Sequence, residues 1–192
     1  MQGIPLTKPT AQHLPATHGA EGPRALRPEN RHLALGMAVA FLMADPAFQG
    51  LRFGHWARVL VGQIRRGHFL FVTDRKILVG FAGWALTSRD RAEEWLAGRS
   101  ELSFQDSQAG DFVILNVWKA TTPAANRFLI DAFRQMFGSK QALYYKRFYA
   151  DGRMRPVRLR VNEFVHRHIS KKRVGADGAS TEAAGPTPSR PE

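Results

Sequence analysis

Side chains that could carry out chemistry are few and scattered in this chain. It has no cysteine, which excludes disulfides and thiolate chemistry. Carboxylates are sparse: Asp106 and Asp111 flank a loop, and Glu93-Glu94 occupy a polar turn. His166 and His168 stand two apart at a strand end, where solvated residues are commoner than metal ligands. The sequence also lacks a Walker loop and the GxGxxG, HExxH and GxSxG motifs, so we predict no metal site and no bound cofactor.

Basic residues dominate the charge of the chain. It carries 28 Lys and Arg against 16 Asp and Glu, a net charge of +12. Such a charge indicates an acidic partner, whether nucleic acid, an anionic membrane or an acidic protein. Six of the cations lie close together near the end of the sequence: Lys146, Arg147, Arg153, Arg155, Arg158 and Arg160. The simplest interpretation of this group is a solvated edge hairpin.

A nucleic-acid-binding domain is one alternative. The aromatic residues among these cations would permit base stacking beside phosphate contacts: Tyr144, Tyr145, Phe148 and Tyr149. Aromatic strand residues more often belong to a core, and no recognised nucleic-acid-binding motif is present. This alternative is therefore the least favoured.

The centre of the chain has the pattern of three consecutive strands, 67–72, 77–86 and 111–118. These runs are rich in β-branched and aromatic residues and are bounded by turn signals. They are apolar at both alternating positions. We therefore expect at least the second and third strands to be covered on both faces of the sheet.

The flanking sequence supplies the covering helices. A helix capped near Asn30 is predicted to run to residue 44, and because it is apolar nearly all round we expect it to be buried. A second helix, 51–65, is ended by Gly67. A third, at 124–137, has an amphipathic stripe. Two last strands, 142–149 and 156–164, follow, with an Asp-Gly hairpin turn between them.

This order, α-α-β-β-β-α-β-β, predicts an α+β (α/β sandwich) fold with a mostly antiparallel central sheet and helices on both faces. It matches the core of the Gcn5-related acyltransferase fold. Residues 1–31 and 170–192 lack periodicity, so we expect disordered tails around one domain, 32–169. The chain has no secretory signal pattern and no apolar run long enough to span a membrane, so no stable membrane insertion is expected.

Four stretches resemble the RTX toxin-activating lysine acyltransferases of the hemolysin C type. They are ALGMAVAFLMADP at 34–46, ILVGFAGWALTS at 77–88, AGDFVILNVWKATTP at 109–123 and VRLRVNEF at 157–164. Each is short, but they follow in the family's order with near-equal spacing.

The resemblance implies an activity and partners. Such enzymes move a fatty acyl chain from acyl carrier protein (acyl-ACP is the donor) to internal lysines of an RTX protoxin, in the cytoplasm before export. Acyl carrier protein is strongly acidic, so the six cations named above would form its binding face. The turn at 119–126 has none of the glycines with which coenzyme A-dependent relatives of the fold hold pyrophosphate, so ordinary coenzyme A binding is not expected. We leave open a homodimer.

Two residues depart from the family's pattern. Its catalytic histidine falls here on Phe48, and its catalytic aspartate falls on Val117. A diverged enzyme would need another base to keep the attacking lysine neutral. We predict His55 for that role and Asn116 as its orienter or as an oxyanion donor, with His32 as a weaker candidate.

Simpler interpretations exist for both predicted site residues. His55 could be a partly buried helix histidine, and Asn116 a strand residue satisfied by its neighbours. In that case the chain would keep the fold, lose catalysis, and serve as a binding or regulatory module.

Overall fold

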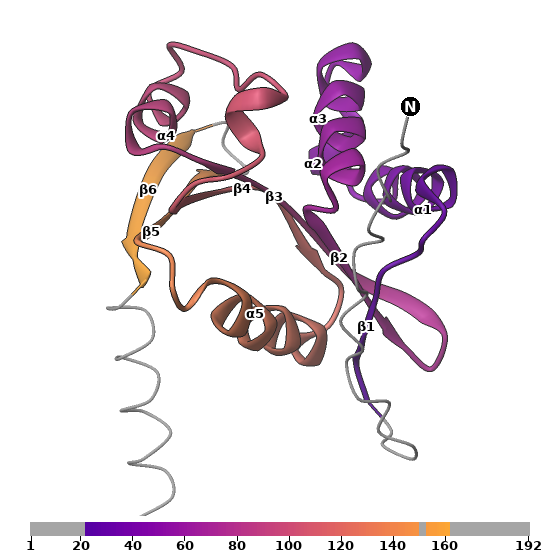
Figure 1. Ribbon diagram of the computed structural model, residues 1–192. Helices are drawn as coiled ribbons and strands as arrows, with labels where there is room; N and C mark the ends of the chain where they lie inside the picture. The colour runs from indigo at the N-terminus through magenta and orange to yellow at the C-terminus, as the bar shows by residue number, and fades with distance from the viewer. Residues whose placement is uncertain (1–21, 150–152, 162–192) are drawn as a thin grey trace, which may run out of the picture.

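The computed structural model describes residues 22–149 and 153–161 of this chain. They form one six-stranded sheet, in the order β1-β2-β3-β4-β5-β6, with helices on both faces (Figure 1). The strands are β1 (Arg24–Leu26), β2 (Phe69–Asp74), β3 (Ile77–Thr87), β4 (Phe112–Ala120), β5 (Ala142–Phe148) and β6 (Met154–Arg160). Neighbours are antiparallel except β4 and β5, which are parallel because α5 connects them. The expected α+β class is confirmed.

Helix ends lie where the sequence signals placed them. The helices are α1 (Arg31–Met43), α2 (Pro46–Gln49), α3 (Phe53–Arg66), α4 (Arg89–Leu96) and α5 (Pro123–Phe137), with a short 3-10 turn, η1 (Gln105–Ser107). The Asn30 side chain accepts hydrogen bonds from the backbone N–H groups of His32 and Leu33 and so caps α1. Gly67 ends α3 in the left-handed conformation, with φ 72°, which glycine adopts without strain.

Strand alternation divides the core into two layers. Phe69, Phe71 and Phe81 face α1 and α3, where they meet buried residues such as Leu60. On the opposite face, Val72, Ala82 and Trp84 pack with Leu129 and Phe133 of α5. A third cluster lies beneath α4, where Leu96 meets Ile114 and Tyr144. The central strands are therefore covered on both faces, as predicted.

Two expectations differ from the structure. Helix α1 is not buried all round: Ala34, Ala38 and Leu42 are buried, whereas Leu33 is 56% exposed, because α1 packs along one side only. Within the segment expected to be a tail, Arg24–Leu26 forms β1, which pairs with β2. A three-residue edge strand carries too little periodicity to be recognised from sequence. The expected boundary near 170 lies outside the described residues.

Candidate functional site

The sheet has a β-bulge at Asn116, in addition to a register shift between β2 and β3. Gly83 of β3 is opposite Val117 of β4, but the next pair is Trp84 and Leu115. Asn116 is therefore the extra residue of the bulge, which bends β4. The Asn116 side chain is half-buried and makes no hydrogen bond to any residue in 22–149 or 153–161.

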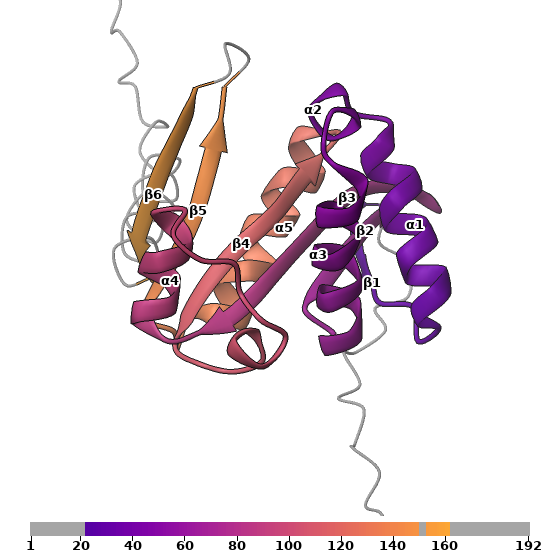
Figure 2. The same cartoon turned by 90° about the horizontal axis from the view of Figure 1, so that it is seen from above.

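Pairing between β4 and β5 stops at this bulge. The two strands pair only from Phe112 with Ala142 to Leu115 with Tyr145. Beyond these pairs the strands diverge, as Figure 2 shows. In the described part of the chain, residues 116–120 of β4 thus have no strand partner on the β5 side. Backbone N–H and C=O groups on that side can bind an extended ligand.

A buried amide lies against the bulge. The side chain of Gln63, on α3, is fully buried and occupies the space beside Gly83, where an added Cβ would lie 2.4 Å from Gln63 Oε1. Neither polar atom of this amide has a hydrogen-bond partner among the described residues. An unsatisfied buried group costs about 1–3 kcal/mol, so it calls for a reason such as function or a bound water.

The two positions that depart from the family's pattern lie in the same apolar cluster. Phe48, on α2, packs against Trp56 of α3, with ring centroids 5.3 Å apart and ring planes tilted by 33°. Phe48 and the buried Val117 of β4 belong to the same apolar cluster. Both positions are therefore part of one apolar cluster, where the resemblance led us to expect a histidine and an aspartate.

An ion pair links the same two segments. Asp45 caps α2 by accepting a hydrogen bond from the backbone N–H of Ala47, and its carboxylate also accepts one from Lys119 Nζ on β4. The hydrogen bond from Lys119 holds the pKa of Asp45 below its usual value. Both side chains are mostly shielded, with exposed fractions of 14% for Lys119 and 30% for Asp45. The pair fixes the C-terminal half of β4 against α2.

His55 lies in the first turn of α3 and has a carboxylate partner. Its Nδ1 is 3.1 Å from Glu101 Oε1, and its side chain is 52% exposed. A carboxylate at Nδ1 sets the tautomer in which Nε2 is free to accept a proton. No contact within the described residues joins His55 to Asn116. His32 lies in the first turn of α1, and its backbone N–H donates to Asn30 Oδ1 at 2.9 Å.

Pleating divides the six predicted binding cations between two surfaces. Lys146 and Arg158 point toward α4, and alternation places Arg160 with them. Arg147 and Arg155, a directly opposed cross-strand pair, point to the other side. Arg153 lies just before β6, with its guanidinium 5.6 Å from the centre of the Tyr149 ring. One continuous basic face is therefore not formed.

On the α4 side of this hairpin, Arg158 is paired with a carboxylate. The Arg158 guanidinium donates two hydrogen bonds to Glu93 Oε2, at 3.0 and 2.6 Å, and the Tyr144 hydroxyl donates to Glu93 Oε1 at 2.9 Å. The bond from Arg158 keeps the pKa of Glu93 low. Lys146 Nζ lies 4.5 Å from the centre of the Trp95 ring, a cation–π contact.

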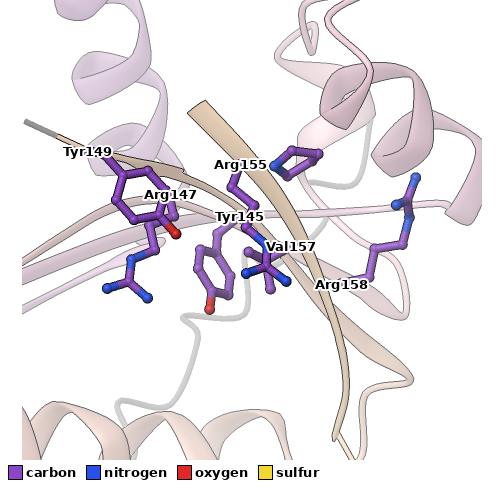
Figure 3. Close-up of a pocket in the computed structure, with 7 residues that line it drawn as sticks. Tyr145, Arg147, Tyr149, Arg155, Val157 and Arg158 are labelled. Atoms are coloured by element: carbon purple, nitrogen blue, oxygen red, sulfur yellow. The ribbon is translucent and has the colours of Figure 1, made fainter. Parts of the chain in front are cut away.

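The opposite side of the hairpin holds a pocket of about 320 Å³ (Figure 3). Its lining residues are Tyr145, Arg147, Tyr149, Arg155, Pro156, Val157 and Arg158. Figure 3 shows Arg158 pointing away from Tyr145 and Arg147.

The described residues contain neither a cluster of metal ligands nor a membrane-spanning helix. Within 22–149 and 153–161, no three His, Asp or Glu side chains gather as metal ligands would. None of the helices in these ranges is long and apolar enough to cross a bilayer.

Sequence reasoning missed Gln63 and the bulge. Gly83 was a usable signal, because a glycine inside an apolar strand often marks a bulge or a close approach. Nothing in the sequence, however, identifies Gln63 as the side chain that approaches it.

The chain was compared with protein families, with curated proteins and with solved structures. The RTX toxin acyltransferase family matches residues 27–172, more than half of the sequence. No curated protein matches the sequence. Among solved structures, the chain is similar to the loading GNATL domain of CurA from Lyngbya majuscula, with 9% identity and a TM-score of 0.44. That match covers 66% of this chain and 65% of the other, just under two thirds of its length.

Proposed function

We propose, from the premise that this chain belongs to the RTX toxin acyltransferase family, that it transfers a fatty acyl chain from acyl carrier protein to lysine side chains of an RTX protoxin. The family itself supplies the coarser statement, an acyltransferase of RTX toxins. The donor, the lysine acceptor and a cytoplasmic site of reaction are the parts we add.

The observation that best supports acyl transfer is the opened sheet at Asn116. The bulge and the end of β4–β5 pairing coincide, so an unpaired strand edge begins where β4 bends. An extended acyl-thioester can lie along such an edge and accept hydrogen bonds from its N–H groups. Donors positioned there, including the amide of Asn116, would stabilise the oxyanion that forms when the thioester carbonyl is attacked.

In the proposed reaction the neutral Nζ of a protoxin lysine attacks the thioester carbonyl carbon. The C–N bond forms, the C–S bond breaks, and the carrier's sulfur leaves. His55 Nε2 accepts the proton lost by the amine and returns it to the departing thiolate, while Glu101 holds Nδ1. The His55 side chain is 52% exposed, and the docked substrates would cover it during the reaction.

The second candidate function is a binding module without catalysis. The apolar cluster that contains Phe48, Trp56 and Val117 favours it, because the resemblance assigns acid–base residues to the positions of Phe48 and Val117. In such a module the opened edge would hold an acyl chain without transferring it.

One experiment separates these two functions. The full chain is mixed with acyl carrier protein bearing a labelled acyl chain and with an RTX protoxin. Binding to the carrier is measured by titration, and hydroxylamine-resistant label on protoxin lysines by mass spectrometry. Amide formation supports the enzyme. Carrier binding with no amide over many hours refutes it and supports the module.

A further inference from the structure

Two arginines face each other across the β5–β6 hairpin. Arg147 and Arg155 are a directly opposed pair in the register, so their Cβ atoms lie about 5 Å apart. Both line the pocket on the side away from α4. Like charges in this position repel and destabilise the strand pair unless an anion lies between them.

Neither arginine has a carboxylate partner in the described residues. Arg147 contacts the Tyr149 ring, 5.1 Å from its guanidinium carbon, and Arg155 makes no ion pair within 22–149 or 153–161. The contrast with Arg158 is instructive, because that residue lies on the same hairpin and is held by Glu93. Arg158 thus has a carboxylate partner within the fold, whereas Arg147 and Arg155 are exposed, have none among the described residues and are open to an external anion.

The rest of the lining restricts the chemistry of that ligand. Tyr145 and Tyr149 lie beside the arginines (Figure 3), and neither hydroxyl is engaged by a described residue. A phosphate group carries a charge between about −1.5 and −2 and three acceptor oxygens, which suits two guanidinium forks and a hydroxyl donor. A carboxylate offers one charge and two oxygens. The volume of about 320 Å³ also exceeds that of a bare phosphate ion and leaves room for an attached organic group.

We propose that the Arg147–Arg155 pocket binds a phosphate ester. The two guanidinium groups neutralise the phosphate, a tyrosine hydroxyl donates to it, and the organic part lies along the tyrosine rings. This site goes beyond the acyl transfer proposed above, because phosphate binding requires neither an acyl chain nor a protoxin. The ester has two sources: a free phosphorylated small molecule, or the phosphopantetheine arm that a carrier protein bears.

The test uses the full chain with pantetheine 4′-phosphate as probe and calorimetric titration as readout. Pantetheine without its phosphate should bind about tenfold more weakly or worse, because the charge-assisted bonds are lost. The Arg155→Gln variant should weaken binding of the phosphorylated probe by about tenfold or more. Without ligand, the same variant should be at least as heat-stable as the wild type, because it relieves the repulsion.

The matched control is Arg160→Gln, which removes the same charge from the same hairpin on its α4 side. Its affinity for the probe should stay within about twofold of the wild type, as expected for a distant exposed charge. Equal losses in Arg155→Gln and Arg160→Gln would overturn the pocket in favour of general surface charge. Equal binding of pantetheine and its phosphate, or no binding of either, would also overturn it.

A second arm identifies the source of the ester. Carrier protein with its phosphopantetheine arm is compared with carrier lacking the arm, against the wild type and Arg155→Gln. An Arg155-dependent preference for the armed carrier assigns the pocket to the carrier's arm. Equal binding of the two carriers assigns it to a free phosphate ester. Since no acyl donor or acceptor is present, a failure of phosphate binding is distinguishable from a failure of acyl transfer.

Discussion

Replacing Gly83 by alanine tests the packing beneath the bulge. A Cβ at this position would lie 2.4 Å from Oε1, 2.6 Å from Cδ and 2.8 Å from Nε2 of Gln63. All three distances are shorter than real Cβ contacts, and Gln63 is fully buried, so its side chain cannot swing into solvent. Overpacking of this kind costs about 1–3 kcal/mol. The lower chain entropy of the unfolded alanine variant returns about 0.4–1 kcal/mol. We expect a net loss of about 1–2 kcal/mol.

The assay is equilibrium unfolding in urea, followed by circular dichroism, for a double-mutant cycle. Gly83→Ala should lower the unfolding midpoint without changing the denaturant slope. In a Gln63→Ala background the clashing amide is gone, so the same substitution should stabilise the chain by the entropy gain of about 0.4–1 kcal/mol. The coupling energy then equals the overpacking cost of about 1–3 kcal/mol. Gly36→Ala is the matched control, since Gly36 is exposed in α1 with nothing within 4 Å of its added Cβ. It should stabilise the chain by about 0.5–1 kcal/mol.

Two results would refute the reasoning. One is a Gly83→Ala variant as stable as Gly36→Ala, which would mean that Gln63 does not occupy the space beside β3. The other is a Gly83→Ala loss that persists in the Gln63→Ala background, which would place the clash elsewhere.

Three further predictions concern charged and titratable groups. Burial, with the charges of Arg66 and Arg27, lowers the pKa of His68 to about 4 from 6.5, so the folded chain keeps this imidazole neutral. The free energy of unfolding should therefore fall as the pH drops from 6.5 to 4. The fall should be about 1–2 kcal/mol larger in the wild type than in His68→Gln, and urea unfolding midpoints at the two pH values measure it. Asp45→Asn keeps a side-chain acceptor for the α2 cap but removes the charge that Lys119 pairs with. The variant should lose up to about 1 kcal/mol of unfolding free energy relative to the wild type. Because the folded pKa of Asp45 is lowered, the full difference should be present above pH 4 and should disappear as the pH falls through that lowered pKa. Glu101→Gln should slow acyl transfer by about tenfold, because the carboxylate that orients the His55 ring through Nδ1 is gone; an unchanged rate would separate Glu101 from the reaction.

Local signals in the sequence predicted much of the fold. Asn30 has the side chain of a helix cap and Gly67 has the backbone freedom of a helix end, so both termini could be located without a structure. Apolar runs without alternation correctly indicated strands covered on both faces. The burial of α1 was overestimated because composition does not say how many sides of a helix find a partner.

The candidate site was harder to predict because it depends on register. The bulge at Asn116 arises from how β4 pairs with β3, and although Gly83 marks β3 as a place for a bulge, nothing local identifies Asn116 as the extra residue on the partner strand. The division of the hairpin cations between two faces could have been predicted from the sequence. Once Lys146 is opposite Pro156 in a hairpin, alternation alone places Arg147 with Arg155 and Lys146 with Arg158. Glu93, which neutralises Arg158, comes from α4 and required the tertiary structure.

The most direct test of acyl transfer by this chain is a single-turnover measurement. Protoxin, excess enzyme and a limiting amount of acyl carrier protein loaded with the fatty chain are mixed, and acyl-lysine is followed by intact mass. We predict that the wild type forms the amide and that His55→Gln forms it about 100-fold or more slowly with unchanged affinity for the carrier. Equal rates for the two proteins, or no acyl-lysine with the wild type, would contradict the proposed reaction centre.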